Sequence, residues 1–340
     1  MKKFINLFGE TNTKKDIMDV AEDFGDLIEA KLIPEGGFDA PLYVMWELTS
    51  KCPNQCMYCY NDSHFKRENE LSRKRKFEIA DSLIKAKVFQ VCLTGGEPTC
   101  CPEYFDLMRY LRTNGIEIGT ILSGANLDKQ KIRKIAQYID MVQISLDGSR
   151  AEIHDKVRQR EGSFDEAVFA IKEFVALGKQ VKVSFATTKY NIDDFANTAE
   201  LCAKLGVSSL RTQRLSVSGR VKGKEDAIYA SEEQFEKLEE YINSKKAPLM
   251  IEYRSPSEHV EFGIKNGFAT VMRINSEGLV GITPYIDVFF GDLKEESFTE
   301  AWNKMKIGWH NEKMLDLAKV MNERENGTLL DPLTSRLYVS

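Results

Sequence analysis

The sequence of 340 residues lacks the features that would place a protein in a membrane, outside the cell or on a nucleic acid. No apolar run approaches the roughly 18 residues that a membrane-spanning helix needs. The basic segment 1–15 has no apolar core of the kind that a signal peptide carries. The formal net charge is -5, so there is no overall positive charge to neutralise phosphates, although a local basic patch stays open. We therefore expect a cytoplasmic protein with no membrane or nucleic-acid partner.

Cysteine is scarce, and the chain shows no internal repeat beyond its strand–helix rhythm and no low-complexity tract. There are seven cysteines, and none follows Cys202. Thiols stay reduced in the cytoplasm, so clustered cysteines indicate metal ligands or catalytic groups instead of disulfides. The apolar composition of 42% is enough for one large domain or for a domain with an appendage.

Compact apolar segments alternate with helical patterns along most of the chain. The expected strands are residues 41–49, 88–96, 117–124, 141–148, 180–188 and 208–215. The expected helices are residues 72–87, 102–114, 128–137, 163–178, 193–205 and 231–245. Six such alternations predict an α/β fold with a parallel sheet covered by helices. Capping boxes are expected at Ser163 with Glu166 and at Ser231 with Gln234.

The pattern changes after residue 248. Two strands are expected around residues 276–278, followed by a helix that opens with Ser297 and Glu300. This predicts a small α+β extension. We therefore divide the chain into an N-terminal extension at 1–40, a core at 41–248 and a C-terminal extension at 249–340.

Three cysteines lie in the loop that follows the first expected strand. Cys52, Cys56 and Cys59 have the spacing C-x3-C-x2-C. Three thiolates can bind three corners of a [4Fe-4S] cluster, and the missing fourth ligand leaves one iron open to a small molecule. Two alternatives remain: a zinc site completed by His64 or Asp62, and thiols that bind nothing.

The three-cysteine motif resembles the signature of the radical S-adenosylmethionine (SAM) superfamily, in which an aromatic residue, here Tyr58, precedes the third cysteine. Two more stretches match in order: "LTGGEPT" at 93–99, and "ISLDG" at 144–148 followed by "HDKVRQREGSF" at 154–164. The last is common in the peptide- and protein-modifying branch. The resemblance runs from about Tyr43 to Arg220.

The resemblance implies a (β/α)6 partial TIM barrel that holds one [4Fe-4S] cluster and SAM. The reduced cluster would cleave SAM to a 5′-deoxyadenosyl radical that abstracts hydrogen from the substrate. An external one-electron reductant of the flavodoxin or ferredoxin type would be needed. The cofactor supplies the difficult step, and the protein positions it and excludes water.

The resemblance also suggests which residues contact SAM. Gly95 and Gly96 would let the backbone approach SAM without a Cβ in the way, and Glu97 would accept a hydrogen bond from its ammonium group. Ser145 and Asp147 are placed for the ribose or the carboxylate, although Asp147 is also a plausible turn former before Gly148.

Arg158 is a candidate partner for the SAM carboxylate, with an exposed helix arginine as the alternative. Ser123, Thr187 and Asn191 are weaker cofactor-binding candidates at strand ends. Cys100 and Cys101 follow the glycine motif directly. They are either packing residues or catalytic hydrogen-atom donors, and a second metal shared with a partner is a remote third option.

The segment 271–302 resembles the SPASM or twitch extension that carries auxiliary clusters in many relatives. It keeps Gly278, "GDL" at 291–293, Ser297 and Trp302, but it has no cysteine. We therefore expect an extension without a cluster, and one cluster in the whole chain.

The resemblance favours a peptide substrate, and in particular the maturation of a ribosomally synthesised peptide. Epimerisation, crosslinking, C–C cleavage and backbone excision all stay open. The 40 residues before the core are too few for a winged-helix recognition domain, so a separate subunit is expected to recruit any leader peptide. Two alternatives are a radical SAM enzyme for a sugar, nucleotide or amino acid, and a non-catalytic metal-binding protein.

Overall fold

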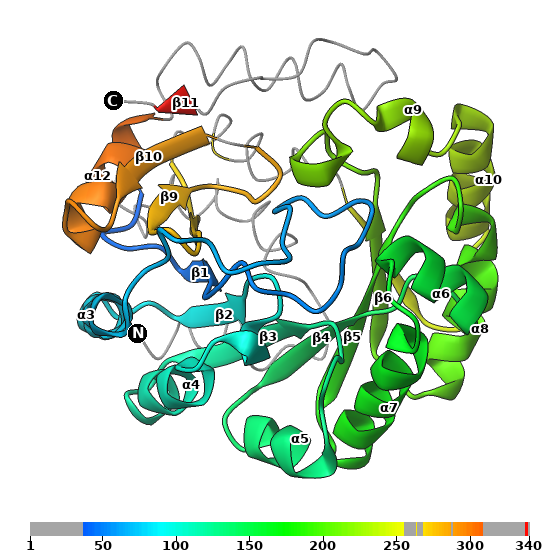
Figure 1. Ribbon diagram of the computed structural model, residues 1–340, viewed down its shortest axis with the longest axis horizontal. Coiled ribbons are helices and arrows are strands. Elements are labelled where there is room, and N and C mark those ends of the chain that lie inside the picture. Colours follow the sequence, from blue (N-terminus) through cyan, green and yellow to red (C-terminus); the bar gives the residue numbers. More distant parts are fainter. Residues whose placement is uncertain (1–36, 255–262, 264–267, 287, 309–336, 339–340) are drawn as a thin grey trace, which may run out of the picture.

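The computed structural model describes residues 37–254, 263, 268–286, 288–308 and 337–338. Most of the predicted N-terminal extension and much of the C-terminal extension lie outside these residues. The described strands form one sheet in the order β11-β10-β9-β8-β1-β2-β3-β4-β5-β6-β7. Figure 1 shows the strands from β1 to β6 curving round, with helices on the outside.

Seven strands run parallel and lie side by side in chain order, because a helical crossover links each strand to the next. They are β1 (Tyr43–Glu47), β2 (Gln90–Thr94), β3 (Glu117–Leu122), β4 (Met141–Ser145), β5 (Gln180–Ala186), β6 (Ser209–Gln213) and β7 (Met250–Arg254). The first six confirm the predicted α/β fold with its parallel sheet. The seventh was not predicted. It pairs with β6 in parallel, so the sheet continues past the boundary that we expected at residue 248.

The helices pack on the sheet through its buried apolar side chains. They are α3 (Arg73–Lys85), α4 (Tyr104–Thr113), α5 (Lys129–Ala136), α6 (Ala151–Arg158), α7 (Ser163–Ala176), α8 (Phe195–Lys204), α9 (Glu225–Ile228), α10 (Glu232–Asn243) and α12 (Phe298–Gly308). In β1, Val44 and Trp46 are fully buried in the core, whereas Tyr43 and Met45, which alternate with them, are only partly buried. This period of two turns Val44 and Trp46 towards the helices. None of the described helices is long and apolar enough to cross a membrane.

Of the two predicted capping boxes, one forms and the other does not. Ser231 and Gln234 cap α10 reciprocally. Ser163 instead donates to Asp155 Oδ1 at 2.7 Å, and the same carboxylate accepts from the backbone N–H of Phe164 at 2.8 Å. Asp155 of α6 therefore caps α7, and the predicted box at Ser163 is wrong because a carboxylate from the preceding helix takes its place.

The C-terminal extension joins the same sheet. β8 (Val271–Ile274) pairs in parallel with β1, and an antiparallel pair with β9 (Leu279–Gly281) follows, as predicted around 276–278. β10 (Val288–Asp292) and the short β11 (Leu337–Tyr338) complete this side. The extension therefore contacts the barrel directly beside β1, the strand that leads into the cysteine loop.

Candidate active site

The sequence motifs meet at one edge of the sheet, because the carboxyl ends of parallel strands all point the same way. The cysteine loop follows β1, the glycine motif follows β2, and Ser123 follows β3. Ser145 and Asp147 lie at the end of β4, and Thr187 follows β5. The predicted residues thus come together although they span well over a hundred positions in the sequence.

The cysteine loop is a compact turn held by its own backbone. The N–H of Cys52 donates to His64 O at 3.1 Å, which closes the two ends of the loop on each other. Within it, the N–H of Cys59 donates to Cys56 O, and the N–H of Ser63 donates to Cys59 Sγ at 3.3 Å. Cys56 is buried, while Cys52 and Cys59 are partly buried.

Arg220 clamps this loop from the far side of the barrel. It follows β6, and its guanidinium donates to Cys56 O at 2.7 Å and to Ser63 O at 2.9 Å. Its own N–H donates to Cys59 O at 2.9 Å. A Cβ on the preceding Gly219 would lie 2.2 Å from Tyr60 O, so only glycine allows this approach. This role was not predicted, because no local pattern connects Arg220 to a loop about 160 residues away.

Helix α6 holds the loop from a second side. The N–H groups of Gln55 and Met57 donate to the carbonyls of Arg158 and Val157 at 3.2 and 3.0 Å. Nη1 of Arg158 also lies 3.5 Å from Cys56 Sγ. Arg158 is 7% exposed, so the alternative of an exposed helix arginine is wrong.

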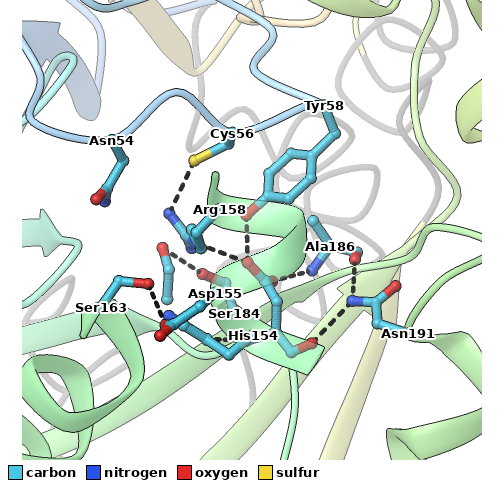
Figure 2. A network of polar contacts seen from close by, with 12 residues as sticks. Asn54, Cys56, Tyr58, His154, Asp155, Arg158, Ser163, Ser184, Ala186 and Asn191 are labelled. Atoms are coloured by element: carbon cyan, nitrogen blue, oxygen red, sulfur yellow. Dashed lines mark hydrogen bonds and ion pairs between the residues drawn. The ribbon is translucent and has the colours of Figure 1, made fainter. Parts of the chain in front are cut away.

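The Asp147 carboxylate is the centre of a buried polar network, and Figure 2 labels its partners Tyr58, Arg158 and Ala186. Its Oδ2 accepts from Arg158 Nε at 2.6 Å and from the hydroxyl of Tyr58. Its Oδ1 accepts from the Ala186 N–H at 2.8 Å. Groups from the cysteine loop, α6 and β5 therefore bind the two carboxylate oxygens. The Asp147 side chain is thus not used to form a turn before Gly148, which was the alternative that we considered. The partly buried Ser145 lies beside Ser184, with 3.4 Å between their hydroxyls.

His154 supports this network as a neutral base. Its Nδ1 accepts from the Asp147 N–H at 2.9 Å, and its side chain is 1% exposed. Burial, together with the nearby Arg158 charge, lowers the pKa of His154 from 6.5 to about 4. In the sequence, His154 was noted only as the first residue of the stretch 154–164.

Two of the weaker candidates at the end of β5 are structural links. Asn191 donates through Nδ2 to Asp147 O at 3.0 Å and to Ala186 O at 2.9 Å, while its Oδ1 accepts from Thr188. The Thr187 hydroxyl donates to Gln213 O at 2.6 Å. These bonds fasten the ends of β4, β5 and β6 to one another.

The glycine motif packs against the start of the cysteine loop, just after β1. A Cβ on Gly95 would lie 2.5 Å from Thr49 O, and one on Gly96 would lie 2.5 Å from Lys51 O. The N–H of Gly96 donates to Thr49 O at 2.6 Å. The structure therefore requires glycine here for close contact between two backbones, a reason that the sequence analysis did not consider.

Glu97 is buried and connects the ends of β2 and β3. Oε2 accepts from the N–H and hydroxyl of Ser123 at 2.8 and 2.5 Å, and Oε1 accepts from the Thr99 hydroxyl at 2.9 Å. Burial raises the pKa of this carboxyl, and the hydrogen bonds from Ser123 and Thr99 oppose the rise. Glu97 and Ser123 thus act on each other, whatever else they bind.

The remaining cysteines differ in position. Cys101 is 3% exposed, and its sulfur lies 3.3 Å from Lys76 Nζ and 3.2 Å from Glu103 Oε2. This places Cys101 in the core between helices and supports its packing interpretation over the donor role. Cys100 is partly buried, and Cys92 and Cys202 are buried.

The residues of the cysteine loop fit a bound metal cluster. Three buried polar atoms directly after Cys59 have no hydrogen-bond partner: Asn61 Nδ2, Ser63 Oγ and His64 Nδ1. Buried polar atoms normally have partners, so these mark a place where a polar group fits. Burial raises the pKa of the Cys52 and Cys56 thiols, and metal binding is the usual way to hold such thiols deprotonated.

Among the described residues, no three His, Cys, Asp or Glu side chains gather closely enough around one point to hold a single metal ion. A cluster does not need such convergence, because each thiolate binds a different iron. Cys52, Cys56 and Cys59 are therefore the residues that would hold it.

Comparison with known proteins agrees with this site. Residues 46–202 match the family model of the Radical SAM superfamily. Mycofactocin maturase MftC of Mycolicibacterium smegmatis is 35% identical over 214 residues, which cover 62% of this chain and 54% of that protein. The AdoMet-dependent heme synthase of Methanosarcina barkeri is 24% identical over 293 residues, covering 79% of this chain and 84% of that protein.

A solved structure shares the fold. The crystal structure of Streptococcus suis SuiB bound to S-adenosylmethionine has a TM-score of 0.62 and 17% identity, and it covers 88% of this chain and 74% of SuiB. A second SuiB structure, bound to precursor peptide SuiA, has a TM-score of 0.61, 15% identity and coverage of 93% and 78%. This chain spans about half the length of MftC. Residues 46–202 therefore form a radical SAM domain.

Proposed function

We propose that the protein is a radical SAM enzyme that uses one [4Fe-4S] cluster to abstract hydrogen from a peptide, in the maturation of a ribosomally synthesised peptide. The observation that carries the proposal is the three-cysteine loop, which Arg158 and Arg220 fix at the carboxyl edge of the sheet. The polar network around Asp147 gives this site a fixed base.

Each part of the chain has a defined task in this proposal. When bound, a reduced cluster of this class transfers one electron to SAM, and cleavage of SAM starts hydrogen abstraction from the substrate. Cys52, Cys56 and Cys59 would hold the cluster as thiolates. Arg158 and Arg220 keep the loop in place.

The residues at the ends of β2 to β5 would line the SAM site. Glu97 and Ser123 bind each other across two strand ends, and Asp147 and Asn191 do the same across two others. A wall of residues that hold one another is rigid, and rigidity favours exact placement of a reactive cofactor. Contacts from Gly95, Gly96, Ser145 and Thr187 to SAM remain predictions.

Two findings support a peptide as the substrate. MftC is named as a maturase, and SuiB was crystallised with its precursor peptide. We further propose an external one-electron reductant and a separate subunit that recruits a leader peptide. The cytoplasmic location expected from the sequence also stays a prediction.

A small-molecule substrate is the second candidate. The heme synthase aligns with a larger share of this chain than MftC does, 79% against 62%. Its name places its chemistry on a small molecule. The alternative of a non-catalytic metal-binding protein would require that the site bind a metal and not SAM.

The first experiment tests the enzyme class. Anaerobically reconstituted protein is incubated with SAM and dithionite, and 5′-deoxyadenosine is quantified by chromatography. We expect its formation in the wild type and none in the Cys52→Ala, Cys56→Ala, Cys59→Ala triple variant. Protein that contains zinc without acid-labile sulfide, or that leaves SAM intact, would end the proposal.

The second experiment separates peptide from small molecule. Each peptide that any small reading frame beside the gene encodes is added, and its mass and the rate of SAM cleavage are followed. A change in peptide mass together with faster cleavage supports the peptide reading. An unchanged peptide, with cleavage stimulated by a porphyrin precursor or a sugar nucleotide, supports the small-molecule candidate.

A further inference from the structure

Arg158 lies between a carboxylate and a cysteine sulfur. Its Nε is 2.6 Å from Asp147 Oδ2, and its Nη1 is 3.5 Å from Cys56 Sγ. The Arg158 and Asp147 side chains are 8% and 1% exposed, so water screens the pair poorly. One face of the guanidinium thus balances a negative charge while another faces a sulfur of the cysteine loop.

The three sulfurs of the loop receive different donors. Cys59 accepts from the Ser63 N–H at 3.3 Å, which is a neutral backbone donor. Cys52 interacts with the charge of Arg160. Cys56 alone of the three has a charged side-chain donor among the described residues. The three sulfurs therefore differ in their surroundings, and Cys56 is the one with a guanidinium of the described residues within hydrogen-bond distance.

The position of Arg158 is fixed on every side. The Arg158 carbonyl accepts from Gln55, one residue before Cys56. The Tyr58 hydroxyl donates to the same Asp147 oxygen as Arg158, and the guanidinium carbon lies 5.6 Å from the centre of the Tyr58 ring. Asp147 itself is anchored by the Ala186 N–H. Figure 2 shows Tyr58, Arg158 and Cys56 around this one point.

We propose that Arg158 is a positioning residue whose charge, balanced by Asp147, sets the reduction potential of the cluster at Cys56. This rests on the proposed function, because it requires a cluster bound by the loop. Reduction adds a negative charge to the cluster. A cation at Cys56 Sγ stabilises the reduced form and raises the potential, whereas Asp147 offsets part of that effect. Hydrogen bonds to cluster sulfurs and net local charge are the terms that tune such potentials.

The test measures the reduction potential of the reconstituted cluster by EPR-monitored titration, without SAM or substrate. Arg158→Gln should shift the potential to more negative values. Asp147→Asn should shift it to more positive values, because Arg158 keeps its charge and loses its counter-ion. We expect each change to alter the ratio of reduced to oxidised cluster about tenfold at a fixed potential, which corresponds to about 59 mV for one electron.

The opposite signs identify charge, because loss of a merely structural pair would disturb both variants in the same direction. Arg158→Lys keeps the positive charge but places it less exactly. Its reduction potential should lie between those of the wild type and Arg158→Gln. This order still decides the question if Asp147→Asn does not fold. Arg112→Gln is the matched control, since Arg112 makes a 2.7 Å pair with Asp140 away from the cysteine loop.

The outcomes separate the two proposals. Wild-type protein that assembles no cluster would overturn the proposed function. A cluster that assembles normally in all variants, with unchanged potentials or with shifts of one sign in Arg158→Gln and Asp147→Asn, would overturn the role of Arg158 alone. Shifts of the expected signs, absent from Arg112→Gln, would support it.

Discussion

Cysteines follow both β1 and β2, yet the two loops use them differently. The loop after β1 holds Cys56 against Arg158 Nη1 and closes on itself through backbone hydrogen bonds. The loop after β2 turns through a short 3-10 helix at Pro98–Cys100 and directs Cys101 into the core. There its sulfur contacts Lys76 and Glu103, which form an ion pair with 3.0 Å between Lys76 Nζ and Glu103 Oε2.

The difference shows that a place at the active edge does not by itself bring a side chain into the site. The chain direction after the strand decides which side of the sheet a residue reaches. In the first loop, contacts from distant elements keep the cysteines at the edge. In the second, Glu97 accepts from the Thr99 N–H at the start of the turn, and the following residues enter the helical layer.

The largest expected effect separates the two groups of cysteines outright. Replacing Cys52, Cys56 and Cys59 by alanine should remove essentially all bound iron from a wild type that holds about four irons per chain. The double variant Cys100→Ala, Cys101→Ala is the control and should keep its iron. Colorimetric iron and sulfide analysis measures both. About eight irons in the wild type, or four left in the triple variant, would contradict the single cluster.

The next effect concerns Glu97, in the second loop. Glu97→Gln should keep the cluster and lose SAM affinity about ten- to a hundredfold, because a charge-assisted hydrogen bond contributes about 1.5–3 kcal/mol. The amide also turns an N–H group towards Ser123 donors, so the free energy of unfolding should fall by about 1–3 kcal/mol. Calorimetry with SAM and urea denaturation measure the two quantities. Lost stability with wild-type SAM affinity would make Glu97 only a link between strands.

A smaller effect concerns His154, which supports the Asp147 network beside the first loop. It is seen in the pH dependence of the free energy of unfolding. The pKa of His154 is about 4 in the folded chain and about 6.5 when unfolded, so between these values only the unfolded state binds the proton. The stabilising contribution is complete above about pH 6.5 and is lost as the pH falls towards about 4. Between about pH 7 and about pH 5 this amounts to about 2 kcal/mol.

His154→Gln should remove that part of the pH dependence while retaining an acceptor for the Asp147 N–H. Urea denaturation of the apoprotein measures the free energy of unfolding of wild type and variant at both pH values. The contributions of the other titrating groups cancel when the two proteins are compared. Equal pH dependence in the two proteins would show that His154 is not buried as a neutral base.

The smallest effect is expected for Cys101. With the true substrate in D2O, Cys101→Ala should deliver solvent deuterium to the product as the wild type does, because its sulfur lies in the core. Cys100 is partly buried and remains the candidate hydrogen-atom donor. Cys100→Ala should cleave SAM and fail to deliver deuterium if the reaction is an epimerisation. Mass spectrometry of the product decides between them, and deuterium lost only in Cys101→Ala would reverse the assignment.

Local sequence patterns predicted much of the fold, because strands and amphipathic helices depend on residues that are near each other in the chain. The six predicted strands and the hairpin around 276–278 are present. The strand β7 was missed. Its residues "MIEYR" include two charged residues, Glu252 and Arg254, which obscure the apolar pattern of a strand. Its pairing with β6 makes it part of the sheet.

The candidate site was predicted as a set of positions, and its contacts were not. Asp147 and Arg158 were each predicted as candidates for contacts with SAM, and the structure adds that they bind each other. Arg273 Nε lies 2.8 Å from Glu47 Oε1, and this ion pair links the extension to β1. None of the sequence motifs predicted it. Long-range pairs of this kind leave no periodic trace in a sequence.

The sequence by itself determined the three thiols, their spacing, the glycines after β2 and the strand–helix alternation that brings the loops to one edge, since each depends on covalent order and local preference. Only the tertiary structure decided that Arg158 faces Cys56, that Arg220 clamps the cysteine loop and that Cys101 is buried. These depend on how segments far apart in the chain pack against one another. A buried charge adopts the partner that folding brings within reach, because leaving it without one costs more than any local preference provides.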